Sequence, residues 1–125
     1  MTISVIIPAF NEERYLPQTL EHLHRAEEHL EAVPDRDVEI IVVDNASSDR
    51  TAEIALAAGT RVIPVPEHNI ARVRNAGAGA ASGGLLIFLD ADTLVPEILL
   101  SRIVQVMSGL SPHAGGMING RLCGR

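Results

Sequence analysis

The chain has 125 residues, enough for one domain with a hydrophobic core. Hydrophobic residues make up 46% and charged residues 21%, a balance that excludes a disordered chain. The net charge of −6 argues against a nucleic-acid-binding protein, which would present a basic face. Cys123 is the only cysteine, which excludes an intrachain disulfide and a cysteine metal cluster.

The chain carries no recognisable targeting or membrane segment. It lacks a basic region followed by a cleavable apolar stretch, and no apolar run approaches the roughly 18 residues of a membrane-spanning helix. We therefore expect a cytoplasmic protein, with peripheral contact at a membrane left open. No internal repeat or low-complexity linker divides the sequence, so residues 1–125 are expected to form a single domain.

The first third of the chain predicts a strand followed by a helix. The apolar run Ile3–Pro8 is typical of a buried strand. Asn11 is a candidate helix N-cap, which would place Glu12 and Glu13 in the first helical turn, where the helix dipole favours acidic residues. Helically spaced leucines then predict a helix that continues to Leu30.

A second strand and helix are predicted over Val38–Val43 and Asp49–Ala58. Asp44 closes the strand, Ser48 is a candidate N-cap, and Gly59 stands where a left-handed glycine ends a helix.

The next two elements are a short strand and an alanine-rich helix. Pro64 predicts that the strand Arg61–Val65 lies at a sheet edge. The helix spans Ile70–Ala81, and Gly77 and Gly79 within it permit close packing on a sheet or a ligand.

The acidic stretch Leu85–Thr93 (LLIFLDADT) is the centre of the functional prediction. Five apolar residues precede Asp90 and Asp92, which predicts a strand buried on both faces of a parallel sheet. Ligands bind at the carboxyl ends of such strands. In an extended chain the two carboxylates would point to the same side, and a hard divalent cation is the natural counter-charge.

The last predicted elements are a helix with Pro96 in its first turn and a weak strand signal over Gly115–Leu122. Strands that alternate with helices predict an α/β fold, with a parallel sheet and right-handed crossovers. If the strand order is 3-2-1-4, the first and fourth strands are neighbours. Pro8–Glu12, Asp44 and Asp90–Asp92 would then meet at one rim.

Other polar residues carry weaker signals. Arg72 and Arg74 precede the acidic strand, and a guanidinium suits a diphosphate, with Arg74 the better candidate. Asp44 and Glu12 also have ordinary explanations, as a turn former and a helix N-terminal carboxylate. The histidines of the first helix are not spaced as a metal pair and are expected to be solvated: His22, His24 and His29.

Two local patterns suggest other functions. The glycine-rich run Gly77–Gly83 follows a helix and precedes a strand, the wrong order for a dinucleotide loop. Asp90–Thr93 is similar to the nucleophile motif of haloacid-dehalogenase-type phosphatases. That motif lies on an early strand, with threonine where this chain has Leu94. A phosphohydrolase that uses Asp90, and a non-catalytic interaction remnant, remain the alternatives.

Four motifs in order resemble glycosyltransferase family 2, over almost all of residues 3–108. They are Ser4–Glu13 (SVIIPAFNEE), Ile40–Thr51 (IIVVDNASSDRT), Ala71–Gly83 (ARVRNAGAGAASG) and Phe88–Thr93 (FLDADT). The resemblance implies a GT-A fold, a Rossmann-like three-layer αβα arrangement with a mostly parallel sheet, here incomplete. It also implies transfer of a sugar from a UDP- or GDP-linked donor to an acceptor hydroxyl, with Mg²⁺ or Mn²⁺ and most often with inversion.

The resemblance assigns roles to particular residues. The base and ribose would contact Pro8, Ala9, Glu12 and Asp44, and the nucleotide would lie near Arg74 and Asn75. The metal would bind at Asp90 and Asp92, with Asp92 the better candidate for direct contact.

One feature of the family is missing. Inverting transfer needs a base for the acceptor proton, but Glu97 stands too early, at a helix start, and His113 is a weak candidate. The acceptor-binding half is expected to be absent, so the chain alone should bind donor and transfer sugar poorly. An uncovered sheet edge and apolar surface predict a homo-oligomer, with exchange of the tail as one route.

Overall fold

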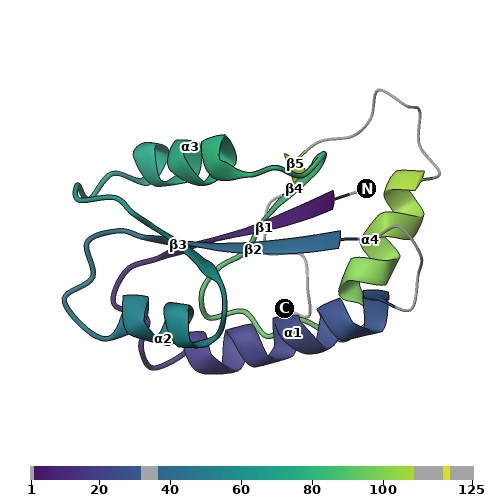
Figure 1. The fold of residues 1–125 in the computed structure, drawn as a ribbon, viewed down its shortest axis with the longest axis horizontal. Helices are drawn as coiled ribbons and strands as arrows, with labels where there is room; N and C mark the ends of the chain where they lie inside the picture. The colour runs from purple at the N-terminus through teal and green to yellow at the C-terminus, as the bar shows by residue number, and fades with distance from the viewer. Residues whose placement is uncertain (1, 32–36, 109–116, 119–125) are drawn as a thin grey trace.

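A computed structural model describes residues 2–31, 37–108 and 117–118 (Figure 1). Five parallel strands form one sheet in the order β3-β2-β1-β4-β5, which confirms the predicted order 3-2-1-4 and adds β5 next to β4. The strands are β1 (Thr2–Ala9), β2 (Asp37–Asp44), β3 (Arg61–Pro64), β4 (Leu85–Phe88) and β5 (Met117–Ile118).

Helices cover both faces of the sheet. The helix α3 lies on one face, and α1, α2 and α4 lie on the other (Figure 1). Their bounds are α1 (Leu16–Glu31), α2 (Thr51–Ala57), α3 (Ile70–Ala80) and α4 (Leu99–Ser108). The predicted three-layer α/β architecture is therefore confirmed. In the described part of the chain, no helix is long and apolar enough to span a bilayer.

Strand β1 lies at the centre of the sheet and contributes to the core on both faces. Val5 and Ile7 pack with the leucines of α1, whereas Ile6 packs with Val73 of α3. All four side chains are almost fully buried. The residues of a central parallel strand are buried on both faces, which explains the unbroken apolar run in the sequence.

The register brings the carboxyl ends of three strands to one edge of the sheet. Ala9 is paired with Asp44 across β1 and β2, and Ile6 is paired with Phe88 across β1 and β4. Beyond the strands, the Leu89 N–H donates to the Ile6 carbonyl at 2.9 Å. The three loops that follow β1, β2 and β4 are therefore neighbours.

The predicted start of the first helix is wrong. The helix α1 begins at Leu16, so Glu12 and Glu13 lie in a loop and not in a helical turn. Asn11 has a positive φ of 51°, and its Oδ1 accepts a hydrogen bond from the Ser48 N–H at 2.8 Å instead of capping α1. The Asn11 side chain is thus bonded to the loop after β2 and not to the first turn of α1.

The second helix also starts later than predicted, at Thr51. Ser48 is not its cap; the Asp49 carboxylate accepts from the Thr51 N–H at 2.9 Å. Gly59 ends the helix with φ of 80°, as expected. Pro64 lies on the edge strand β3, which confirms that prediction.

The predictions for Pro96 and Gly79 need correction. Pro96 is not in the first turn of the last helix but precedes α4, and the Leu99 N–H donates to the Pro96 carbonyl at 3.1 Å. The strand β4 ends at Phe88, before the acidic pair. Close packing is confirmed for Gly77, where a Cβ would lie 2.4 Å from Ile6 Cγ2, but a Cβ on Gly79 would meet open space. Of the predicted strand at residues 115–122, only β5 is described, and His113 and Cys123 lie outside the described residues.

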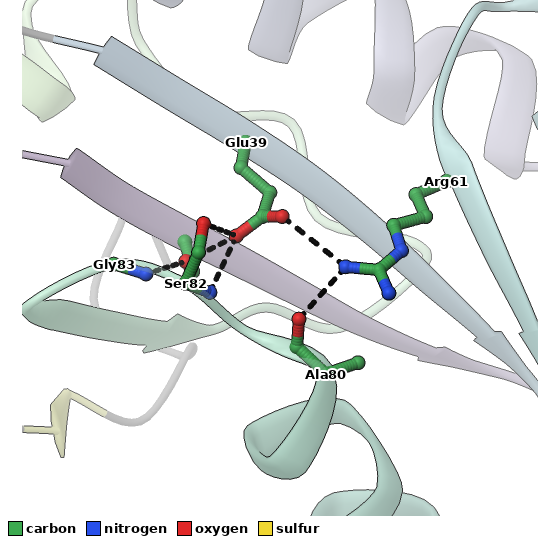
Figure 2. A network of polar contacts seen from close by, with 6 residues as sticks. Glu39, Arg61, Ala80, Ser82 and Gly83 are labelled. Atoms are coloured by element: carbon green, nitrogen blue, oxygen red, sulfur yellow. Dashed lines mark hydrogen bonds and ion pairs between the residues drawn. The ribbon is translucent and has the colours of Figure 1, made fainter.

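A polar network joins four elements at the amino end of the sheet (Figure 2). The Glu39 carboxylate accepts hydrogen bonds from the Ser4 hydroxyl and the Ser82 N–H, at 2.7 and 2.9 Å. Arg61 donates to Glu39 at 3.4 Å and to the Ala80 carbonyl at 2.8 Å. This network ties β1, β2 and β3 to the connection between α3 and β4, at the opposite end from the three loops.

Candidate functional site

A cavity of about 690 Å³ opens at the carboxyl ends of β1 and β4. Its volume lies in the range of small-molecule and cofactor sites. The loop after β1, the turn after β4 and the first two turns of α3 form most of its wall. Of the residues predicted from the sequence, six line the cavity: Pro8, Ala9, Glu12, Arg74, Asp90 and Asp92.

Two predicted residues lie elsewhere. Asp44 and Asn75 are not among the described residues that line the cavity. Asp44 ends β2, and its carboxylate accepts from the Ser47 N–H at 3.2 Å, while the next residue, Asn45, reaches the cavity wall. Asn75 is exposed on α3.

Seven further lining residues were not predicted as ligand contacts: four of them are buried, and the other three are Phe10, Asn45 and Ile70. Phe10 and Ile70 are large apolar side chains that are 47% and 64% exposed. Exposed apolar residues beside polar ones are typical of ligand sites. Phe10 follows Pro8 and Ala9 directly, so its position in the first motif was the available signal.

The acidic pair lies in a turn and not in an extended strand. The Thr93 N–H donates to the Asp90 carbonyl at 3.1 Å, which closes a tight turn around Ala91 and Asp92. The side chain of Ala91 is only 2% exposed, whereas Asp90 is half-buried and Asp92 is exposed. The two carboxylates thus reach the same cavity by a different local geometry from the one predicted.

Hydrogen bonds between the first two loops hold Glu12 in place. The Asn11 N–H donates to the Ser47 hydroxyl, and the Glu12 N–H donates to the Thr51 hydroxyl, both at 2.9 Å. The positive φ values of Asn11 and Ala46, 51° and 58°, cost about 1 kcal/mol or more each for residues other than glycine. The bonds between the loops offset that cost.

The pKa of Glu12 is raised above its usual range. The largest cause is burial, followed by the negative charges of Asp92, Asp49 and Asp90. The pKa of Asp49 is instead lowered: burial alone would raise it, but hydrogen bonds from the hydroxyl and N–H of Thr51 and from the Glu13 N–H outweigh that effect. The cavity edge therefore concentrates negative charge that a cation would neutralise.

The carboxylates fit a divalent ion that also binds a ligand. Among the described residues, no group of three or more His, Cys, Asp or Glu side chains is arranged to hold a metal ion. Mg²⁺ is commonly held by one or two carboxylates together with substrate phosphates. Asp90 and Asp92 match that donor set.

A positive side chain lines the same cavity. The Arg74 guanidinium carbon lies 4.5 Å from the centre of the Phe88 ring, within cation–π distance. Arg74 is on α3, three residues before Gly77, and Phe88 is the last residue of β4. Close packing of α3 on the sheet thus brings a guanidinium to the cavity wall, where it suits an anionic ligand.

The predicted exposure of the three histidines on α1 is confirmed only for His29. His22 and His24 are partly buried, and His24 lies between Glu27 and the Ala58 carbonyl, at 3.2 and 3.1 Å. None of the three lines the cavity.

Comparisons with known proteins connect this geometry to a family. The chain is 36% identical over 114 residues to an undecaprenyl-phosphate 4-deoxy-4-formamido-L-arabinose transferase of Photorhabdus laumondii, a match that covers 82% of this chain and 33% of the relative. The chain thus spans about a third of the length of this relative. The crystal structure of S. aureus TarS 1-349 superposes with a TM-score of 0.73 at 24% identity, over 86% of this chain and 32% of that one, which supports the expected GT-A fold.

A second solved structure adds ligands. Glucosyl-3-phosphoglycerate synthase of Mycobacterium tuberculosis, in complex with Mn²⁺, UDP and glucosyl-3-phosphoglycerate, has a TM-score of 0.64 at 28% identity, over 83% of this chain and 38% of that one. The sequence profile of the family described as "Glycosyl transferase family 2" matches residues 4–114. With the profile spanning nearly the whole chain, from β1 past α4, this chain belongs to glycosyl transferase family 2.

Proposed function

We propose that this chain binds a nucleotide-diphosphate sugar through a divalent metal, as the donor-binding part of a glycosyltransferase. The observation that carries the proposal is the single cavity that Glu12, Asp90, Asp92 and Arg74 share. A diphosphate needs both a cation and donors, and this cavity offers carboxylates for the metal and a guanidinium for the phosphate. The UDP and Mn²⁺ of the mycobacterial relative suggest the first ligands to test.

The proposed roles follow the cavity. Asp90 and Asp92 would hold Mg²⁺ or Mn²⁺, with Asp92 in direct contact. When bound, the ion would neutralise the diphosphate and stabilise the departing nucleotide as negative charge builds on it. Arg74 would contact the diphosphate. Pro8, Ala9, Glu12 and Asp44 would contact the base and ribose, and Asn75 would lie near the nucleotide beside Arg74.

The reaction we propose is transfer of the sugar to an acceptor hydroxyl, with inversion. A base must take the acceptor proton, and the candidates that follow Asp92 in the sequence are Glu97 and His113. Glu97 is exposed in the turn before α4 and does not line the cavity, and His113 lies outside the described residues. We therefore propose that the 125-residue chain binds donor but transfers sugar poorly by itself; robust turnover by the purified chain would refute this.

A thermal-shift panel tests the proposal directly. UDP and GDP, each with Mn²⁺, with Mg²⁺ or with a chelator, should raise the melting temperature only when metal is present. Asp92→Asn should abolish the shift. Glu97→Gln is the matched control. It also removes a carboxylate after β4, but Glu97 is exposed and does not line the cavity.

The same panel, together with an assay for phosphate release, separates the alternatives. A phosphohydrolase would release phosphate and lose that activity on Asp90→Asn, although the family assignment favours a transferase. An interaction module would show no response to nucleotide or metal and a response to a protein partner. Either result would refute the proposed donor binding.

A further inference from the structure

A buried threonine supports the acidic turn from below. Thr19 lies on the core face of α1 among leucines and is 0% exposed. Its hydroxyl donates a hydrogen bond at 2.5 Å to the carbonyl of Ala91, which is 72 residues away in sequence. Ala91 is the residue between Asp90 and Asp92, so the bond ends on the backbone of the acidic turn.

The hydroxyl has one proton and two nearby acceptors. Besides the Ala91 carbonyl, the Tyr15 carbonyl lies 3.1 Å away, one turn back along the helix. The Tyr15 carbonyl already accepts from the Thr19 backbone N–H at 3.2 Å. The hydroxyl proton is therefore assigned to the Ala91 carbonyl, which is the nearer of the two acceptors. A buried carbonyl is rarely left without a donor, which favours the same assignment.

The turn is thus fixed at its middle residue. The Ala91 side chain packs in the core beneath the sheet, and its carbonyl is held by α1. The residues on either side, Asp90 and Asp92, both line the cavity. A shift of Ala91 would therefore move both carboxylates together.

We propose that Thr19 is a positioning residue that sets the geometry of Asp90 and Asp92 for metal-dependent nucleotide binding. The inference rests on the proposed function, but Thr19 itself touches neither metal nor nucleotide. Metal ligands must be held within about 0.5 Å of their productive positions, so a displaced turn weakens binding without removing a ligand. Loss of a hydrogen bond to a ligating side chain typically lowers metal affinity by about tenfold to a hundredfold, and we take about tenfold for Thr19 because it holds the backbone between the two carboxylates.

The chain offers a closely matched set of variants. Thr19→Val keeps the shape of the side chain and removes only the hydroxyl, and Thr19→Ser keeps the hydroxyl. Thr60→Val is the control, because the Thr60 hydroxyl donates to the Ala55 carbonyl at 2.9 Å and Thr60 is also buried, but it lies between α2 and β3. If Thr19→Val does not fold, Thr19→Ala compared with Thr19→Ser tests the same hydroxyl.

The first measurement is Mn²⁺ affinity in the presence of saturating UDP, read from the electron paramagnetic resonance signal of free Mn²⁺. We expect Thr19→Val to weaken Mn²⁺ binding by about tenfold or more, with Thr19→Ser and Thr60→Val close to wild type. Equal losses in Thr19→Val and Thr60→Val would show a general packing effect and overturn the inference. Unchanged affinity in Thr19→Val would overturn it as well.

The second measurement needs no ligand. The Thr93 N–H closes the acidic turn, so its hydrogen exchange should be faster in Thr19→Val than in wild type and unchanged in Thr60→Val. If wild type shows no metal-dependent UDP binding, the proposed function fails and the inference fails with it. If wild type binds and Thr19→Val matches it in both measurements, the inference fails alone.

Discussion

Substituting the two glycines of α3 by alanine should have opposite effects on stability. At Gly77, an added Cβ would lie 2.4 Å from Ile6 Cγ2 and 3.1 Å from Val43 Cγ2, and both partners are 0% exposed. Relief of these contacts would require repacking of fully buried side chains. At Gly79, an added Cβ would have no heavy atom within 4 Å. The pair therefore isolates packing from backbone propensity within one helix.

The magnitudes follow from these contacts. Overpacking a buried site costs about 1–3 kcal/mol, and the contact at Gly77 is more than 1 Å inside ordinary van der Waals distance, so we take about 2–3 kcal/mol. The higher helix propensity of alanine returns up to about 1 kcal/mol. Gly77→Ala should then lose about 1–2 kcal/mol, and Gly79→Ala should gain about 0.5–1 kcal/mol.

Urea denaturation followed by circular dichroism measures both free energies of unfolding. With an m-value of about 1.5 kcal/mol/M, a gap of about 2 kcal/mol separates the two midpoints by about 1.3 M. Equal m-values would show that the unfolding transitions are comparable. Midpoints that shift by the same amount in the same direction would refute the close approach of α3 to β1 and β2.

Three further predictions concern charge and assembly. The pKa of Glu39 is lowered: burial alone would raise it, but the hydrogen bonds from Ser82 and Ser4 and the charge of Arg61 outweigh that effect. The Glu39 carboxylate should contribute its full stabilisation above the ordinary glutamate pKa and lose it as pH falls through the lowered pKa. Glu39→Gln should therefore be less stable than wild type at pH 7 and equally stable in acid. Glu12 has a raised pKa, so its charge opposes folding at neutral pH. Glu12→Gln should therefore melt at a higher temperature than wild type at pH 7, and this gain should shrink as pH falls through the raised pKa and be gone below the ordinary glutamate pKa. The same variant should bind UDP with Mn²⁺ more weakly. The edge strand β3 and the exposed apolar side chains of Leu56 and Val106 predict self-association, and a clean monomer by sedimentation at high concentration would contradict it.

The strand order and the place of the site could be predicted from the sequence because both depend on residues buried in parallel strands. Unbroken apolar runs mark such strands, and a carboxylate directly after one marks its carboxyl end. The acidic pair and the β1 loop were placed at one rim on that basis. The cavity confirms this placement for Glu12, Asp90 and Asp92, whereas the chemical roles of these residues stay a prediction.

The loop geometry could not be predicted, because its hydrogen bonds join residues far apart in sequence. Asparagine is a typical helix N-cap residue, but the hydrogen-bond partners of Asn11 are Ser47 and Ser48, which lie 36 and 37 residues away. A local pattern cannot reveal that competition. Similarly, the turn after β4 depends on Thr19 of α1, which in sequence is only one polar residue in a helix.

The cavity's chemistry and its geometry therefore come from different sets of residues. The charged groups that face the cavity are supplied by short loops and by one turn of α3. Their positions depend on residues that do not line the cavity. Thr19 bonds to the acidic turn, Thr51 bonds to the Glu12 N–H, and Gly77 allows the helix that carries Arg74 to pack closely on the sheet. Because each of these contacts is buried or partly buried and specific, a substitution there should change ligand affinity through the position of a neighbour. Loss of donor binding in a variant is thus weak evidence that the altered residue touches the ligand, unless its supporting contacts are tested as well.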